Sequence, residues 1–291
     1  MKKSIILIAL VVAFSAVNAQ KGKVTTAQTL KDSGKLDKAL EAITQASDAS
    51  NADAEKSLNW PKTWQVRGEI YQAIGQSKDE NFKKLSSDPF GEAFSSYKKA
   101  MELDPKHAID KSIKMNLVLL TNDFTNQAVQ AFQNEDYNKA LESFERIMEI
   151  NNMPVIKADN PNSVDTVIIF NSALAAYNAE KYDVAVKYYK ESAKYGYNGA
   201  RTYSLMAAAY QMQRDTVSAL TCLQEGSQKY PDDNSILESM IQIYMDRGKT
   251  DEALANLEKA IKQDPTQPRY YFAMGRSEER RVGKECRSRW S

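Results

Sequence analysis

The side chains that could carry chemistry are few and widely spaced along the chain. In 291 residues there is one histidine, His107, and there are two cysteines, Cys222 and Cys286. A single imidazole cannot build a metal cluster, and the sequence has no glycine-rich phosphate loop, no Cys-x-x-Cys pair and no Gly-x-Ser-x-Gly turn. We expect His107 in a surface loop and Cys222 as a small buried residue on the apolar face of a helix. The sequence therefore predicts no catalytic residue, no metal site and no cofactor, and we do not expect an enzyme.

The tripeptide Asp-Thr-Val occurs twice, at residues 165–167 and 215–217. It resembles the Asp-Ser/Thr-apolar acceptor of some periplasmic O-glycosylation systems, in which Thr166 and Thr216 would carry the sugar. The local explanation is helix capping or a turn, because an aspartate before a helix accepts hydrogen bonds from the free N–H groups of its first turn. Both interpretations stay open at this stage.

The elements that position any binding side chain follow from a fixed period. Residues of one kind recur 34 positions apart, as in Met206, Met240 and Met274, or in Ala185, Ala219 and Ala253. Within each copy the apolar residues follow helical spacing. Gly248 separates two helices, and Pro231 and Pro265 end others, since proline lacks the N–H and clashes with the preceding turn. Such a period indicates stacked copies of one helical hairpin and not a single closed core.

Two copies can be aligned residue by residue. One copy contains Tyr203, Met206, Ala207, Tyr210, Ala219, Leu223, Gly226 and Pro231, and the next contains Leu237, Met240, Ile241, Tyr244, Ala253, Leu257, Ala260 and Pro265. These residues resemble the tetratricopeptide repeat (TPR), which has large, small and proline residues at the same offsets. The resemblance implies an all-α fold, a right-handed TPR-type α-α superhelix (a solenoid of helical hairpins). It extends over residues 20–275 as about six repeats and the start of a seventh.

The N-terminal residues 1–19 have the pattern of a secretory signal peptide. Lys2 and Lys3 precede an apolar run at residues 5–14, and a small-x-small cleavage site ends at Ala19. The alternative is an uncleaved membrane anchor, but the apolar run is shorter than the roughly 20 residues that cross a bilayer. We expect a periplasmic or secreted bacterial protein, with no transmembrane segment after cleavage.

The C-terminal residues 276–291 do not continue the repeat. They resemble the translation of a sequencing-library adapter, which predicts a non-native tail and a natural sequence that continues beyond Gly275. The alternative is a basic arm for nucleic acid or a membrane. Gly283 is expected to weaken any helix in this stretch.

The charge balance also bears on the partner. The formal net charge of the whole chain is +1. Without the basic tail and the two leader lysines the balance becomes mildly acidic, so we expect no nucleic-acid partner. The oligomeric state does not follow from the sequence.

In proteins of the resembled family, the first helices of successive repeats line a concave groove. Carried over by position, the groove residues are Thr125, Asn126, Val129, Phe132, Phe170, Asn171, Leu174, Tyr177, Arg201, Ser204, Ala208, Gln211, Glu238, Gln242 and Met245. Aromatic and amide side chains in such a stripe suit an extended peptide or a partner helix. The alternative for Phe132, Phe170 and Tyr177 is that they pack inside the array.

The resemblance and the lack of catalytic motifs together predict an exported, noncatalytic scaffold for protein–protein interaction, with a protein or peptide as its partner. The alternative is the N-terminal docking module of a longer envelope protein, with a catalytic or peptidoglycan-binding domain beyond it. Two insertions, at residues 75–91 and 151–163, interrupt the period and are either functional or tolerated length variation. Phe82 and Leu85 give the first insertion apolar side chains with which to pack down.

Overall fold

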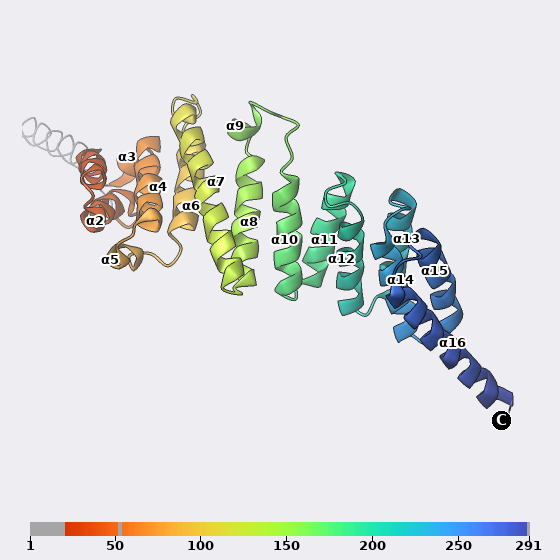
Figure 1. Cartoon of the computed structure of the whole chain (residues 1–291). Helices are drawn as coiled ribbons and strands as arrows, with labels where there is room; N and C mark the ends of the chain where they lie inside the picture. The colour runs from red at the N-terminus through yellow and green to blue at the C-terminus, as the bar shows by residue number, and fades with distance from the viewer. Residues whose placement is uncertain (1–20, 52–53, 290–291) are drawn as a thin grey trace, which may run out of the picture. The chain divides into compact units, whose positions relative to one another are not determined.

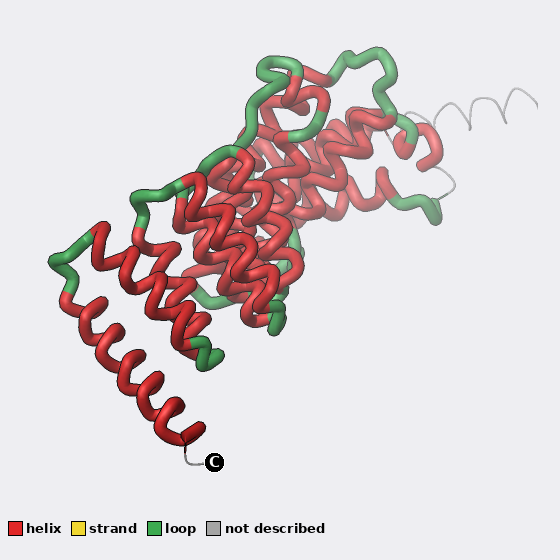
Figure 2. Tube along the Cα trace, turned by 90° about the vertical axis from the view of Figure 1, so that its right-hand side faces the viewer, coloured by secondary structure: helices red, strands yellow, loops and turns green. Residues whose placement is uncertain are grey.

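The computed structural model describes residues 21–51 and 54–289, so the predicted signal peptide lies outside the described residues. Within these ranges the secondary structure consists of helices joined by turns and loops (Figure 2). Residues 21–32 are helical, and the helices labelled in Figure 1 follow. They are α2 (Leu36–Ser47), α3 (Glu55–Leu58), α4 (Pro61–Gln76), α5 (Glu80–Lys83), α6 (Pro89–Glu102), α7 (Asp110–Gln133), α8 (Tyr137–Asn151), α9 (Pro154–Lys157), α10 (Thr166–Asn178), α11 (Tyr182–Lys194), α12 (Ala200–Met212), α13 (Thr216–Lys229), α14 (Asn234–Asp246), α15 (Thr250–Gln263) and α16 (Pro268–Arg289).

The described chain forms two compact units. The first comprises residues up to 127 together with 149–163, and the second comprises residues 128–148 together with 164 onward. In the first unit α2 packs on α4, and α4 packs on α6. Its core joins Ile43 of α2 to Ile70 and Ile74 of α4, all with 0% of their surface exposed.

The second unit is a run of antiparallel hairpins. The pairs α10–α11, α12–α13 and α14–α15 each pack together, every hairpin also contacts the next one, and α12 contacts α14 directly. The apolar positions that recur with the 34-residue period are buried, among them Met206, Ala219, Leu223, Met240 and Ala253. The predicted all-α, TPR-type fold is therefore confirmed.

Helix capping explains both Asp-Thr-Val tripeptides. Asp165 Oδ1 accepts a hydrogen bond from Ile168 N at 3.1 Å, and Asp215 Oδ1 accepts one from Ser218 N at 3.0 Å. The hydrogen bonds from Ser218 also lower the pKa of Asp215. Each aspartate thus satisfies an N–H group that the first helical turn leaves free.

The turns between the two helices of a hairpin share one backbone conformation. Gly34 and Gly248 have φ of 74° and 66°, and Glu135, Glu180 and Arg214 adopt the same left-handed region with φ between 59° and 62°. In each case the next residue donates its N–H to a carbonyl five positions back, as in Lys181 N to Ala176 O at 2.9 Å. This pattern ends a helix with a left-handed residue, a place that favours glycine because a Cβ is strained there.

Replacing the strained residues by glycine should therefore stabilise the fold. We expect Glu180→Gly and Arg214→Gly each to raise the free energy of unfolding by about 1 kcal/mol. Urea denaturation followed by circular dichroism measures the change. The control is Lys187→Gly, in the exposed interior of α11, which should lower the same quantity by about 1 kcal/mol. Destabilisation by all three glycines would contradict this account of the turns.

The first insertion is ordered. It contains the short helix α5, and Phe82 and Leu85 are partly buried against the core of the first unit. Phe90 makes an edge-to-face contact with Phe124, with ring centroids 6.0 Å apart. The second insertion contains α9, and most of its residues from 158 to 163 are exposed.

The C-terminal helix α16 continues through Gly283 to Arg289. Arg, Lys and Glu around the glycine are good helix formers, and one glycine costs about 1 kcal/mol, so the weakening at Gly283 stays a prediction. α16 packs on α15 through the buried Tyr270, but Tyr271 and Phe272 are exposed, Phe272 by 75%.

Candidate functional site

The predicted groove residues fall in both units. Thr125 and Asn126 belong to the first unit, where Thr125 is half-buried and Asn126 is exposed. Val129, in the second unit, is 48% exposed on α7. The remaining predicted residues lie on or beside α10, α12 and α14 of the second unit, apart from Phe132 near the end of α7.

Six of the positions named in the sequence lie on the first helices of three successive hairpins. We call these six positions the first-helix stripe: Asn171 and Leu174 on α10, Ser204 and Ala208 on α12, and Glu238 and Gln242 on α14. None of the six is buried. Ser239 Oγ donates to Ser204 Oγ at 3.2 Å, which shows that α12 and α14 lie close along the stripe.

The predicted aromatic anchors are not free on this surface. Phe170 is only 4% exposed and meets Tyr189 and Tyr197 edge to face, with ring centroids 5.9 and 5.5 Å apart. Phe170 is thus a core residue, as the alternative interpretation of the sequence held. A partner could contact its ring only after the core had opened.

Phe132 and Tyr177 are half-buried at the ends of first helices. Each forms an edge-to-face pair across the hairpin turn, Phe132 with Tyr137 at 5.1 Å and Tyr177 with Tyr182 at 5.6 Å. These pairs hold the two helices of a hairpin together, and only the outer edges of the rings are available to a partner.

The other predicted residues border the stripe. Arg201 and Gln211 are exposed on α12, and Met245 is half-buried against the apolar cluster of α14, α15 and α16. Glu238 accepts hydrogen bonds from Tyr270 Oη at 2.6 Å and from Arg269 at 2.5 Å. At this end, therefore, the carboxylate of the stripe is already engaged within the fold.

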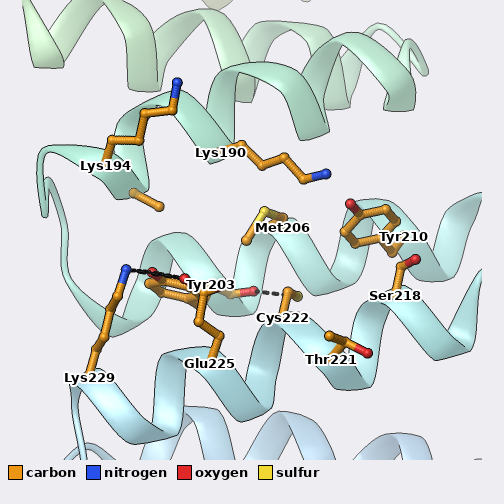
Figure 3. Close-up of a pocket in the computed structure, with 11 residues that line it drawn as sticks. Lys190, Lys194, Tyr203, Met206, Tyr210, Ser218, Thr221, Cys222, Glu225 and Lys229 are labelled. Atoms are coloured by element: carbon orange, nitrogen blue, oxygen red, sulfur yellow. Dashed lines mark hydrogen bonds and ion pairs between the residues drawn. The ribbon is translucent and has the colours of Figure 1, made fainter.

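The structure contains a second feature that the sequence did not predict, a pocket of about 410 Å³ on the second-helix side of the same unit. It lies between α11 and α13, with α12 as its floor (Figure 3). Lysines stand at its rim, and Met206 and Cys222 lie between them. No sequence motif marks it, because its residues come from three different helices.

Hydrogen bonds fix one end of the pocket. Lys229 Nζ donates to Tyr203 Oη at 2.7 Å and pairs with Glu225 at 3.1 Å, and Tyr203 Oη donates to Glu225 at 3.2 Å. Burial is the main reason that the pKa of Tyr203 is raised. The phenol therefore stays neutral, and the triad keeps Lys229 protonated.

Cys222 is buried, as the sequence predicted, and it is a free thiol. Burial raises its pKa to about 12, so it is protonated and unreactive at neutral pH. Cys222 contributes to the pocket because its small side chain leaves space between the helices. His107 also lies where the sequence placed it, in an exposed loop, with Nδ1 3.0 Å from Asp110 Oδ2.

Two observations concern kinds of site that the described residues lack. The described residues contain no group of three or more His, Cys, Asp or Glu side chains placed to hold a metal ion. Among the described helices, none is both long enough and apolar enough to span a bilayer.

Comparison with known proteins identifies the class. The family model described as "TPR repeat" matches residues 242–277, which run from α14 through α15 into α16. The hairpins that precede this segment have the same helical construction and the same buried positions. The resemblance to the TPR repeat that the sequence implied is therefore confirmed for residues 242–277. No curated protein matches the sequence.

Solved structures show only distant similarity. PilW, titled a widely conserved type IV pilus biogenesis factor, is 14% identical over 88% of this chain and 98% of its own, with a TM-score of 0.41. YrrB, titled a TPR protein with an unusual peptide-binding site, is 18% identical over 71% and 98%, with a TM-score of 0.39. MamA is 16% identical over 65% and 96%, also with a TM-score of 0.39. Similarity at this level carries no functional inference.

Proposed function

We propose that this protein is an exported, noncatalytic scaffold that binds a peptide or a partner helix along the first-helix stripe. The observation that carries the proposal is that the first helices of three successive hairpins each present amide, hydroxyl or aliphatic side chains that are not buried, and that α12 and α14 lie in contact. A partner helix or extended peptide needs such a run of adjacent anchors on a rigid support. Among the six side chains of the stripe there is no paired acid and base that would activate the hydroxyl of Ser204.

The stripe predicts where a partner will crosslink. A photo-crosslinking amino acid at Leu174, Ala208 or Gln242, which occupy one position in three first helices, should give covalent partner adducts in the cells that make the protein. The same probe at Lys187 or Ala255, both exposed on second helices, is the control and should give few adducts. Equal adducts at all five positions, or adducts only at the controls, would refute the stripe as the binding surface.

Export is the second part of the proposal, and it rests on the sequence of residues 1–19. We expect the intact mass of the natively produced protein to correspond to a chain that begins at Gln20. The same spectrum tests Thr166 and Thr216: each sugar would add at least about one hexose to the mass, and we expect none because Asp165 and Asp215 are helix caps. A chain that retains its leader would rule out cleavage after Ala19.

A further inference from the structure

The pocket between α11 and α13 exists because one side chain is smaller than its counterparts in the neighbouring hairpins. Cys222 is the seventh residue of α13, where α11 has Tyr188 and α15 has Asn256. In the preceding interface Tyr188 Oη donates to Glu145 at 2.8 Å and bridges the two second helices. At the position of Glu145, α11 has Lys190, which cannot make that bridge to a thiol. The gap between second helices therefore stays open here.

The charge of the pocket is not a property of the repeat. Its rim has Lys190 and Lys194 on α11 and Lys229 on α13, against a single carboxylate, Glu225. One period later the three lysine positions are occupied by Gln224, Gln228 and Gln263. Because the fold forms equally well with glutamines, packing does not require these lysines.

The lysines differ in what they already contact. Lys229 is held by Tyr203 and Glu225, and Lys194 pairs with Glu191 at 2.5 Å. Lys190 makes no ion pair with any described residue. Its ammonium lies 5.5 Å from the ring centroid of Tyr210, above the pocket (Figure 3). A ligand carboxylate would therefore find Lys190, which has no carboxylate partner among the described residues, and a helical turn away Lys194, whose partner Glu191 it would join or displace.

The floor adds an apolar requirement. Met206 and Cys222 lie beneath the lysines and are buried, with Ala193 at the side. The volume is within the range of pockets that bind small groups through apolar contact and a few charges. Methionine sulfur and methyl groups pack well on aromatic rings. The lysines at the rim and the apolar residues of the floor together favour a ligand with an aromatic ring that enters the pocket and carboxylates that flank the ring.

We propose that this pocket binds an acidic peptide, with one aromatic side chain lying between α11 and α13 beside Ala193 and Tyr210, above Met206 and Cys222, and adjacent carboxylates paired with Lys190 and Lys194. The pocket opens between the second helices α11 and α13 and uses Tyr203, Met206 and Tyr210 of α12, whereas the stripe uses Ser204 and Ala208 of α12, so the two sites share no residue. Peptide binding at the pocket depends on charge complementarity at α11 and α13, and the proposal does not require that the stripe crosslinks a partner.

The test uses the full chain labelled with ¹³C at the methionine methyl groups. The probe is the acetylated, amidated peptide EEFEE. We expect the methyl signal of Met206 to shift on titration, while that of Met240, which occupies the same place one repeat later, stays in position. The peptides QQFQQ and EEGEE, which lack the carboxylates or the ring, should bind at least roughly tenfold more weakly.

Charge-reversed variants complete the test. Lys190→Glu with Lys194→Glu should weaken EEFEE binding by roughly tenfold or more, since two ion pairs are lost and repulsion replaces them. The matched control reverses Lys187 and Lys262, which are exposed on second helices outside the pocket, and should leave the affinity within about twofold. Equal melting temperatures of the two variants exclude a folding defect. Equal binding of QQFQQ, a shift of Met240 like that of Met206, or no shift at millimolar peptide would each overturn the proposal. Failure of the stripe crosslinks would leave it standing.

Discussion

Replacing Phe170 by alanine should cost about 3–5 kcal/mol of the free energy of unfolding. The ring is almost fully buried between Tyr189 and Tyr197, and removing it opens a cavity in the middle of the hairpin α10–α11. Both tyrosines pack edge to face with the Phe170 ring, so each also loses an aromatic contact when the ring is removed. The expected result is a lower midpoint of urea denaturation, with loss of hydrogen-exchange protection in α10 and α11.

The matched control for Phe170→Ala lies one helical turn further along. Leu174 is half-buried on the same helix and faces the stripe, so Leu174→Ala should lose less stability than Phe170→Ala. If the two variants lost equal stability, Phe170 would not be the core residue that the structure shows. The comparison also guides binding studies, because loss of partner binding in Phe170→Ala would report on folding and not on recognition.

The second large effect should come from Gly68→Ala in α4. A Cβ at this position would lie 2.4 Å from Cε1 and 2.6 Å from Cδ1 of Tyr97 on α6. The Tyr97 ring has 0% exposure, and its hydroxyl donates to Gln72 Oε1 at 2.8 Å, so the ring has no room to retreat. Gln72 in turn donates to Asp123 at 2.6 Å. We therefore expect the added methyl group to separate α4 from α6 and to cost about 1–3 kcal/mol.

A glycine with free space around it is the control. Gly275 in α16 has no atom within 4 Å of its hypothetical Cβ, so Gly275→Ala should be neutral or gain up to about 1 kcal/mol through helix propensity. Chemical denaturation of both variants measures the difference in sign. The α4–α6 packing described here would be wrong if Gly68→Ala were as stable as the parent protein.

The period was sufficient to predict the helices and most of the core. Alanines such as Ala219 and Ala253, and the large residues Tyr203 and Met240, are buried where the repeat pattern placed them, because a hairpin array leaves each position one kind of neighbour. The cap at Asp165 was one of the two interpretations that the sequence left open, and it was available because capping depends on local geometry alone.

Features that depend on side-chain size across several helices were not predictable. The pocket arises because Cys222 replaces a larger residue opposite Lys190, and no single helix shows this. The position of Phe170 was left open because periodicity places a residue on a helix but does not show which of two flanking helices covers it. Nothing in the sequence marked Glu180 and Arg214 as left-handed residues, whereas a glycine marks the equivalent turn at Gly248.

The recurrence of that left-handed turn has a consequence for how arrays of this kind change in length. Glu180, Arg214 and Gly248 occupy the same place in successive hairpins, with the same backbone and the same hydrogen bond behind them. A recombination event that joins the gene after Glu180 to the codon after Arg214 removes one 34-residue period, which contains α11 and α12, and joins α10 to α13 through the same kind of turn. Copies can thus be lost or duplicated in genetic exchange, while the surfaces on the remaining helices are free to diverge.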